Sequence, residues 1–502
     1  MDTPPDPLDS DSTASEAPDS EQDIRARIRA AVRVLEEISE DRSVLAQADP
    51  DDRRRLVHAA GRVWTPDETR RRQLTRALAK QRKAEAKRRK DEALDETGIR
   101  TLRRRPTYTT PNVYPPALPT EAAPVDNVGS QHCYVCKAPF TELHHFYDQM
   151  CPPCAALNYR KRGELADLSG RLALLTGGRV KIGYQAGIKL LRCGAELIVT
   201  TRFPKDAAAR YAQEDDFEDW GHRLRIYGLD LRHTPSVEAF CTELIETRDR
   251  LDILINNACQ TVRRPPEFYA HMMAEEAAAL AQLPSSLRDA LVAPSRVDVP
   301  GLTHAAELSQ LPLLPEESQA RYELFPAGEL DQDLQQVDLR ETNSWRMLMA
   351  EVPTVELLEV HLVNAVAPFV LNARLKPLML RTENRDKHIV NVSAVEGQFY
   401  RNAKTTRHPH TNMAKAALNM MTRTSAADYQ NDGIHMNAVD TGWVTDEDPA
   451  TIAARKTEIH GFHPPLDIVD GAARIVDPII SGMRTGEHLW GHFLKDYKPT
   501  DW

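Results

Sequence analysis

Residues Arg171 to Gly183 read RLALLTGGRVKIG, a short apolar run that passes into a glycine-containing turn. The apolar run, Leu172 to Leu175, is typical of a parallel strand that is covered on both faces. The glycines at 177, 178 and 183 allow a tight turn and a close approach of the backbone to a ligand. A helix over about 182–193 would then direct its first N–H groups at a diphosphate. This stretch predicts the first strand–turn–helix unit of an α/β fold.

Five further apolar segments follow the first in a regular order, separated by stretches with helical character. They cover residues 195–200, 224–231, 251–258, 389–393 and 435–439. Strands that alternate with helices form a parallel sheet with helices on both faces. Such a sheet binds its ligand at the carboxyl ends of the strands. The fold class predicted here is therefore α/β, with a doubly wound parallel Rossmann sheet.

The order of these motifs resembles that of the short-chain dehydrogenase/reductase family over residues from about 168 to 500. In that family a TGxxxGxG turn binds the cofactor pyrophosphate, and this chain has Thr176 to Gly183 in its place. An NNAG segment supports the sheet, and the chain reads Asn256-Asn257-Ala258-Cys259 there. The resemblance implies a nicotinamide dinucleotide cofactor and oxidoreductase chemistry on a carbonyl or alcohol substrate.

The resemblance also implies a set of cofactor-binding residues. Lys181 replaces the second turn glycine, where it either pairs with the phosphates or crowds them. Arg202 follows the second strand, and an arginine there without an acid favours the 2′-phosphate of NADP over the bare ribose of NAD. Asp230 matches the family residue that meets the adenine. The full set is Gly177, Arg179, Lys181, Ile182, Gly183, Arg202, Asp230, Asn257 and Lys415.

The catalytic residues of the family are only partly present. Asn364 and Lys415 match the family asparagine and lysine. The serine position is Ala394, with Ser393 one step away, and Thr411 stands where the family has its tyrosine. That tyrosine acts as general acid/base because its pKa is lowered towards the working range. An aliphatic hydroxyl is far less acidic than a phenol, so Thr411 cannot take over this role. The Pro-Gly pair after the sixth strand is also changed, to Thr441-Gly442.

Two hypotheses follow from this altered catalytic set. The favoured one is an NADP-binding protein with degenerate catalysis, which acts as a cofactor-responsive binding or scaffolding protein. The alternative is an active NADPH-dependent oxidoreductase that uses a non-standard proton donor. Tyr400 and His410 are the candidates for that donor, since imidazole titrates in the useful range and Tyr400 precedes the helix of Lys415.

Four cysteines occur in two closely spaced pairs, Cys133/Cys136 and Cys151/Cys154. Two such pairs supply the four thiolates of a tetrahedral structural zinc site. His144 or His145 can replace one ligand, but four cysteines already close the coordination shell. The alternative is a small hairpin with four reduced thiols and no metal. The remaining cysteines are scattered, which argues against a secreted disulfide framework.

The region ahead of the cysteines has a changing composition. Residues 1–20 are acidic and Pro/Ser-rich and are expected to be disordered. A helical region is expected over 21–103, with an apolar seam (Ile24, Ile28, Ala31, Leu35, Ile38) that favours packing on a neighbouring helix. A basic helix over about 66–96 has eleven Lys or Arg between residues 70 and 90. A Pro-rich linker over 104–130, a zinc module over 131–160 and a Rossmann domain over 168–502 complete the organisation.

Composition limits the remaining possibilities. The net charge of −10 gives no general reason to expect nucleic acid, so a nucleic-acid-binding protein is the least favoured hypothesis and would depend on the basic helix. No apolar run suggests a membrane span, and a cytoplasmic protein is expected. The basic helix and the zinc module are candidates for contact with a protein partner. The family resemblance implies a homo-oligomer.

An insertion over about 262–350 is expected either to cover the substrate side or to form an oligomer contact.

Overall fold

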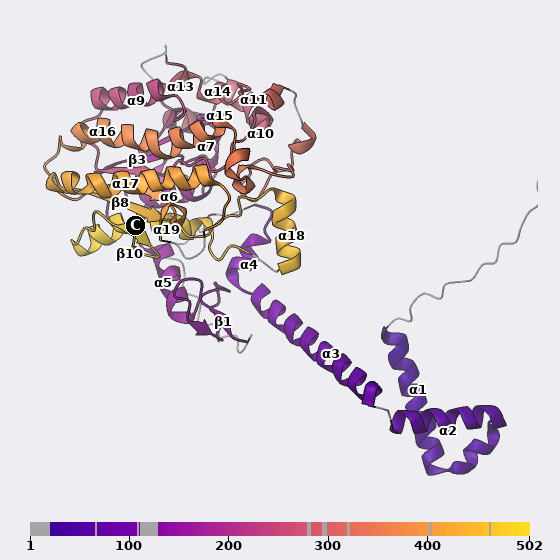
Figure 1. The fold of residues 1–502 in the computed structure, drawn as a ribbon. Helices are drawn as coiled ribbons and strands as arrows, with labels where there is room; N and C mark the ends of the chain where they lie inside the picture. Colours follow the sequence, from indigo (N-terminus) through magenta and orange to yellow (C-terminus); the bar gives the residue numbers. More distant parts are fainter. Residues whose placement is uncertain are drawn as a thin grey trace, which may run out of the picture. The chain divides into compact units, whose positions relative to one another are not determined.

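The computed structural model describes residues 21–65, 68–107, 110, 129–278, 283–293, 299–318, 322–400, 404–460 and 463–502. They form two compact units, one that ends at Arg88 and one from Arg89 to Trp502 (Figure 1). The segment 1–20, which we expect to be disordered, lies outside the described residues. Most of the Pro-rich segment 104–130 also lies outside them.

Helices make up the first unit. They are α1 (Glu21–Glu40), the short 3-10 helix η1 (Arg42–Gln47), α2 (Pro50–Trp64) and α3 (Glu68–Asp95), which continues into the second unit. The Asp49 carboxylate caps α2 by accepting a 2.9 Å hydrogen bond from the N–H of Asp51. The predicted basic helix is thus confirmed as α3. The predicted packing of the apolar seam is not seen within the first unit, where no described residue in 22–65 or 71–88 is buried.

An eight-stranded sheet forms the centre of the second unit, in the order β10-β9-β8-β7-β6-β3-β4-β5. All neighbouring strands are parallel except the β9/β10 hairpin at one edge. The predicted doubly wound parallel sheet is therefore confirmed. The strands are β3 (Leu172–Thr176), β4 (Glu196–Thr201), β5 (Leu224–Gly228), β6 (Ile253–Asn256), β7 (Lys387–Ser393), β8 (Ile434–Asp440), β9 (Phe493–Lys495) and β10 (Lys498–Thr500).

Helices cover both faces of the sheet (Figure 1). In β3, Ala173 and Leu175 pack on the side of α6 and α19, whereas Leu172 and Leu174 pack on the side of α9 and α16. Both faces of the strand are thus apolar, which explains its unbroken apolar run. The covering helices are α6 (Lys181–Arg192), α7 (Pro204–Ala212) and α19 (Ile468–Thr485) on one face, and α9 (Thr234–Thr247), α16 (Ala367–Met379) and α17 (Pro409–Asn431) on the other.

One helical run, Thr354–Met379, has the length and composition of a membrane span, in contrast to the expectation from the sequence. It consists of α15 (Thr354–His361), a π-helical turn (Leu362–Val366) and α16. Half of the apolar window is buried, and Leu371 and Leu375 are completely covered by the core. A buried helix of this kind is what the fold requires on the face of its sheet.

The cysteine-containing module packs directly on α19 and on the loop after β8. It contains α4 (Gly98–Arg103), the hairpin β1 (Gln131–His132) and β2 (Pro139–Phe140), and α5 (Pro152–Gly163). Arg162 of α5 forms a two-pronged ion pair with Asp467, at 2.6 and 2.9 Å, at the start of α19. Ile468 belongs to the same buried cluster as Tyr147 and Met150 of the module. The module therefore shares a core with the sheet domain.

The insertion consists of short helices and turns along the carboxyl edge of the sheet. Phe268, Tyr269 and Phe325 of the insertion pack around Phe203, which follows β4. The helix α11 ends at Ala277, and residues 279–282 lie outside the described part. The elements are α10 (Pro266–Tyr269), η3 (Ala270–Met272), α11 (Met273–Ala277), α12 (Ser285–Ala290), α13 (Pro300–Thr303), α14 (Ala305–Leu308), η5 (Pro315–Ser318), η6 (Tyr322–Leu324), η7 (Ser344–Arg346) and η8 (Met349–Glu351).

Four small elements complete the second unit. These are α8 (Phe217–Trp220), η2 (Gly221–Arg223), η10 (Val395–Gly397) and α18 (Ala450–His460). Of these, η10 follows β7, and its Gly397 lies against the backbone of Lys415, where a Cβ would be 2.8 Å from the Lys415 carbonyl carbon. Glycine is thus needed at this contact, which brings the end of β7 close to α17.

Candidate dinucleotide site and catalytic region

The turn after β3 is built around two glycines and one asparagine. Gly177 has φ +70°, and a Cβ on Gly183 would lie 2.2 Å from the Gly177 carbonyl oxygen. The Asn257 amide donates hydrogen bonds to the carbonyl oxygens of Thr176 (3.1 Å) and Gly177 (3.0 Å). The turn is therefore held closed by the strand β6, and the first turn of α6 lies directly against it. These are the features that a backbone cradle for a diphosphate requires.

A cavity of about 530 Å³ opens at the carboxyl ends of β3, β4 and β6. Its lining includes the turn and the first residues of α6, with segments 200–203 and 229–232 from the ends of β4 and β5. Insertion residues 335–338 and the loop 445–448 after β8 also line it. The volume lies in the range of small-molecule and cofactor sites, and the position is the one expected for a ligand of a doubly wound sheet.

Lys181 begins α6 in the left-handed region, with φ +55°, where a glycine is usual. Burial raises the pKa of Asp333 to about 6, and the positive charge of Lys181 opposes that rise. The pKa of Glu447 is lowered despite its burial, and the charge of Lys181 is the largest of the causes that lower it. Lys181 therefore interacts electrostatically with carboxylates from both the insertion and the β8 loop.

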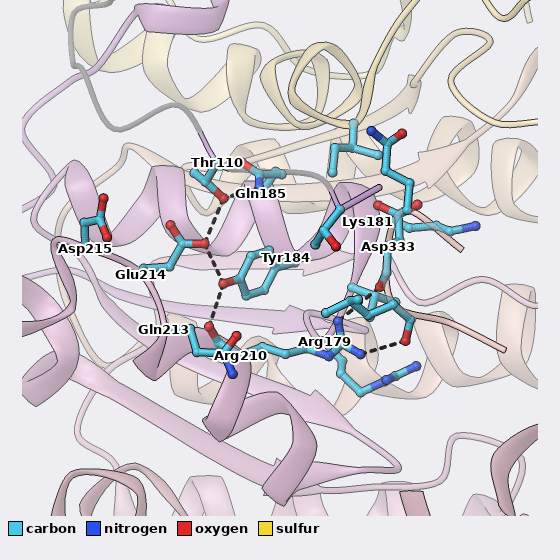
Figure 2. Close-up of a pocket in the computed structure, with 15 residues that line it drawn as sticks. Thr110, Arg179, Lys181, Tyr184, Gln185, Arg210, Gln213, Glu214, Asp215 and Asp333 are labelled. Carbon is cyan, nitrogen blue, oxygen red and sulfur yellow. Dashed lines mark hydrogen bonds between the residues drawn. The ribbon is translucent and has the colours of Figure 1, made fainter. Parts of the chain in front are cut away.

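Arg179 is buried and held by an ion pair. Its Nη1 atom lies 2.7 Å from Asp206 of α7, and that carboxylate also accepts from Arg210 Nε at 2.8 Å. A smaller cavity of about 180 Å³ lies beside Arg179 and Lys181, and Figure 2 shows the side chains that line it. There the hydroxyl of Tyr184 donates to Glu214 at 2.6 Å. Arg179 thus stabilises the turn through α7, and its contact with a phosphate stays a prediction.

Arg202 follows β4 and lies in the wall of the main cavity. Its Nη2 atom donates to the Tyr269 hydroxyl at 2.7 Å, and the guanidinium lies over the Tyr269 ring. Burial alone would raise the pKa of Tyr269, but the charges of Arg202, Arg264 and Arg232 outweigh burial and lower it. Three guanidinium groups therefore act on the Tyr269 hydroxyl, and two of them, Arg232 and Arg264, are also paired with carboxylates. Tyr269, which orients Arg202, comes from the insertion and has no counterpart in the sequence motifs.

Asp230 also lies in the cavity wall, yet its carboxylate is already engaged. It accepts hydrogen bonds from Arg232 Nε at 3.0 Å and Nη2 at 2.6 Å, and from the Arg232 N–H at 2.9 Å. Arg232 in turn pairs with Glu359 of α15 at 3.0 Å. The predicted contact of Asp230 with an adenine would therefore compete with Arg232, which the sequence motif does not include.

Asn364 and Lys415 occupy buried positions next to the carboxyl end of the sheet. Asn364 lies in the π-helical turn, where its side chain accepts from the Gln260 N–H at 2.8 Å and donates to the Gln260 carbonyl at 2.9 Å. Lys415 Nζ donates to the Val392 carbonyl of β7 at 2.9 Å. Asn364 thus connects the π-helical turn to the loop after β6, and Lys415 connects α17 to β7. Neither of them lines the 530 Å³ cavity.

Thr411 lies one helical turn before Lys415 and is buried. Its hydroxyl and that of Ser393 have no hydrogen-bond partner among the described residues. Strand alternation puts Ser393 on the same face as Asn391, which donates to Thr422 of α17 at 3.0 Å. The hydroxyls at these positions are aliphatic, so neither has the acidity of a phenol.

The two substitute proton donors suggested by the sequence lie in opposite environments. Tyr400 is 94% exposed. His410 is 2% exposed, and burial, with smaller contributions from His408 and His361, lowers its pKa to about 4. An imidazole with this pKa is neutral near pH 7 and carries no proton to give as an acid.

The four cysteines predicted to bind metal do come together. Their sulfur atoms all lie within 4.8 Å of one another, and Cys136 and Cys151 are 3.6 Å apart. Tetrahedral zinc with Zn–S bonds of about 2.3 Å needs sulfurs about 3.8 Å apart, so the geometry fits. Burial raises the pKa of Cys133, but N–H groups of Cys151, Cys136 and Val135 outweigh it and lower the pKa to about 7.

Two family models match the sheet domain. One described as short chain dehydrogenase matches residues 171–281, and one described as enoyl-(acyl carrier protein) reductase matches residues 342–463. The segment 282–341 between them falls inside the predicted insertion. The models thus match the two parts of the Rossmann domain that surround the insertion.

Several proteins are similar in sequence. An uncharacterized protein of Acanthamoeba polyphaga mimivirus is 30% identical over 374 residues, covering 72% of this chain and 74% of the relative. That match is longer than residues 168–502 alone provide, so it takes in part of the chain before the Rossmann domain. Human retinol dehydrogenase 13 is 33% identical over 93 residues, 18% of this chain and 28% of the relative. The match to this dehydrogenase therefore spans less than a third of its length.

Solved structures give a weaker likeness. The NADP complex of RhlG from Pseudomonas aeruginosa is 18% identical with a TM-score of 0.41, and the match covers 65% of this chain and 95% of that one. An NADPH-bound carbonyl reductase from chicken fatty liver is 18% identical with a TM-score of 0.40, covering 67% and 100%. The sequence relatives and the two family models decide the assignment. This chain belongs to the short-chain dehydrogenase/reductase family.

Proposed function

We propose that this protein binds NADP(H) at the turn after β3 but lacks the proton donor of an active family member. It would then act as a cofactor-responsive binding or scaffolding protein. The observation that carries the proposal is Thr411, one helical turn before Lys415, at the position of the catalytic tyrosine. When bound, the cofactor supplies a hydride, and the family tyrosine supplies the accompanying proton.

Binding of a dinucleotide is supported by the backbone of the turn. A Cβ on Gly177 would lie 2.8 Å from the Ala258 Cα, so the glycine is required by packing as well as by its φ. Ile182 and Gly183 at the start of α6 line the cavity. Helix N-termini of this kind bind phosphate through their first N–H groups. These features support a diphosphate cradle in a chain that has different residues at the family's catalytic positions.

The choice of NADP over NAD is supported by Arg202. Its hydrogen bond goes to a neutral phenol, and no carboxylate ion pair of Arg202 occurs among the described residues. A 2′-phosphate at this end of the cavity would gain a charge-assisted hydrogen bond. An acid at this position would instead favour the ribose hydroxyl of NAD.

Calorimetric titration of zinc-replete protein with NADPH and NADH tests the cofactor proposal. We expect tighter binding of NADPH, and Arg202→Ala should weaken it by about 10- to 150-fold, as loss of a hydrogen bond to a charged group costs about 1.5–3 kcal/mol. NADH binding should change little. Arg288→Ala, on α12 and away from the cavity, is the matched control. Absence of binding to both cofactors would overturn this part of the proposal.

A test of turnover addresses the loss of catalysis. We expect no oxidation of NADPH above background with a panel of aldehydes and ketones. The alternative is an active reductase with Tyr400 or His410 as the donor, and it predicts turnover that Tyr400→Phe or His410→Ala removes. Turnover that Lys415→Ala abolishes would contradict degenerate catalysis, whichever donor is used.

Zinc binding by Cys133, Cys136, Cys151 and Cys154 is the second part of the proposal. Four thiolates leave no coordination position for a substrate, so the ion would be structural. The module packs against the start of α19, which supports a role within the chain. Contact with a protein partner is therefore assigned to the basic helix α3 rather than to the buried side of the module.

A further inference from the structure

Helix α1 carries an apolar stripe that the described chain leaves uncovered. The exposed fractions are 46% for Ile24, 59% for Ile28, 45% for Val32 and 42% for Leu35. These residues lie on one side of the helix, because positions three, four, seven and eight apart share a face. A stripe of β-branched and leucine side chains is far more apolar than the exposed face of a solvated helix.

No other described residue of the first unit provides a core for this stripe. The described residues in 22–65 and 71–88 contain no buried side chain. Val63 and Trp64 of α2 and Leu74 of α3 are themselves exposed. Helices in proteins gain most of their stability from burying an amphipathic face rather than from intrinsic propensity. The stripe on α1 is therefore available to a surface from outside the first unit.

The charges of α1 decide what kind of surface fits. Four arginines lie in its first two-thirds, at 25, 27, 29 and 33, and three glutamates lie in its last turns, at 36, 37 and 40. Glu21 and Asp23 stand at the helix N-terminus, where negative charge is favoured by the macrodipole. With five acidic against four basic residues, α1 has no net positive charge for an anionic membrane to attract.

We propose that α1 of one copy packs antiparallel on α1 of a second copy. The antiparallel direction places the arginine-rich part of each helix beside the glutamates of the other, whereas a parallel pair would place like charges together. Arg25 and Glu36 are about three helical turns apart and therefore flank the stripe on the same side. A two-fold axis near Ala31 would bring Arg25 of each helix to Glu36 of its partner.

Removal of the stripe's apolar character tests the interface in the full-length protein. Sedimentation equilibrium of wild type over roughly 1–100 µM should show reversible self-association, since a single helix pair of about 30 Å gives a small interface. Ile28→Asp combined with Leu35→Asp should raise the dissociation constant by about 100-fold. Leu74→Asp on α3, also an exposed leucine, is the matched control and should leave self-association unchanged.

Charge reversal tests the direction of packing. Arg25→Glu with Arg27→Glu, and separately Glu36→Arg with Glu37→Arg, should each weaken self-association by about fivefold. An equimolar mixture of the two proteins should restore wild-type association, because each arginine or glutamate again faces its opposite. A parallel pair predicts no weakening in either variant alone, since like residues already face each other there.

The outcomes separate this proposal from association through the Rossmann domain. If that domain also self-associates, the Ile28/Leu35 variant should form an assembly of half the wild-type mass. Equal masses for wild type and this variant at every concentration would overturn the proposal. A further combination of results is that the Ile28/Leu35 variant weakens self-association while a mixture of the two charge-reversal variants fails to restore it. That combination would overturn the antiparallel arrangement. Circular dichroism of each variant confirms that helix content outside α1 is retained.

Discussion

The proposed loss of catalysis rests on the contrast between Thr411 and Lys415. The buried Lys415 of α17 bonds to the Val392 carbonyl and so joins this helix to β7. The threonine keeps the hydroxyl at the tyrosine position, yet its hydroxyl lacks the acidity needed to donate a proton near neutral pH. We therefore expect the contact between α17 and β7 to persist even if the acid/base function is absent.

Gly183 is the glycine on which the shape of the turn depends most strongly. A Cβ there would lie 2.2 Å from Gly177 O and 2.3 Å from Asn257 Nδ2, and both of these groups hold the turn. We expect Gly183→Ala to lower the free energy of unfolding by about 2 kcal/mol, as overpacking does, and to abolish dinucleotide binding. Urea unfolding and calorimetry measure the two effects.

Gly61→Ala provides the control for that substitution. Gly61 lies inside α2, and a Cβ there would meet nothing within 4 Å. This variant should leave the urea transition of the Rossmann domain and its cofactor affinity unchanged. Normal cofactor binding by Gly183→Ala would contradict the assignment of the turn as the diphosphate site.

Lys181 carries a conformational cost that glycine would remove. Its φ of +55° costs an L-residue about 1–2 kcal/mol relative to glycine. We expect Lys181→Gly to raise the free energy of unfolding by about 1 kcal/mol, because loss of its attraction to Asp333 and Glu447 offsets part of the gain. Lys137→Gly, at φ +63° in the cysteine hairpin, should give a similar gain without any change in cofactor affinity. A loss of stability in Lys181→Gly would show that the electrostatic contribution dominates.

At the scale of elements, the cysteine module supports the loop that lines the cofactor cavity. The Tyr134 hydroxyl accepts a 2.9 Å hydrogen bond from the Trp443 N–H, just before the cavity-lining segment 445–448. Arg103 Nη2 donates to the carbonyl oxygen of Leu466 at 2.6 Å, on the far side of the same loop. Two elements that are distant in sequence thus position one wall of the site.

This arrangement connects metal content to cofactor binding. Zinc analysis of wild type should find about one ion per chain, and Cys151→Ser should lose it together with a large part of the thermal stability, since structural zinc contributes directly to folding. Cofactor affinity should fall as well, because the loop after β8 loses its support. Cys241→Ala, in α9, should keep its zinc. Wild-type metal content below about half an equivalent would contradict the site.

At the scale of the whole molecule, a buried histidine cluster at the amino ends of β7 and β8 makes stability depend on pH. His388 is fully buried, and its Nε2 atom is 3.0 Å from His488 Nδ1. Burial, followed by the charges of His435 and His488, lowers the pKa of His388 well below 6.5. The pKa values of His435 and His488 are also lowered, mainly by burial. The cluster is therefore neutral in the folded state at pH 7.

Acid lowers the stability of the protein, because the pKa values of these histidines are lower in the folded state than in the unfolded chain. Below pH 6.5 the unfolded chain takes up protons on these histidines while the folded state does not, so acid favours unfolding. We expect the stability of wild type relative to His388→Gln to fall by about 1 kcal/mol between pH 6.5 and 5.5. Urea unfolding at both pH values measures this, and above pH 7 the difference should be constant. His222→Gln, at an exposed site, is the control and should show no such trend.

Much of the fold was predictable because it depends on local pattern. The apolar run 172–175, the glycines of the turn and the repeated strand segments define a parallel sheet whose order follows from chain connectivity. The spacing of the four cysteines likewise indicated their convergence. The basic helix and the altered catalytic positions are also visible in the sequence, because each is a property of neighbouring residues.

The tertiary structure alone decided which partners the charged groups have. Arg179 pairs with Asp206, Asp230 with Arg232, and Tyr400 points into solvent, although each matched or neighbored a functional motif. The docking of the cysteine module on α19 and the exposure of the α1 stripe were not predictable either. Ion pairs and burial depend on which distant segments meet in three dimensions, and side chains such as arginine can reach several acceptors. The sequence by itself determined the fold and the presence of threonine at the position that matches the family tyrosine, because both are set by local pattern, whereas long-range packing determined the partners of each charged residue.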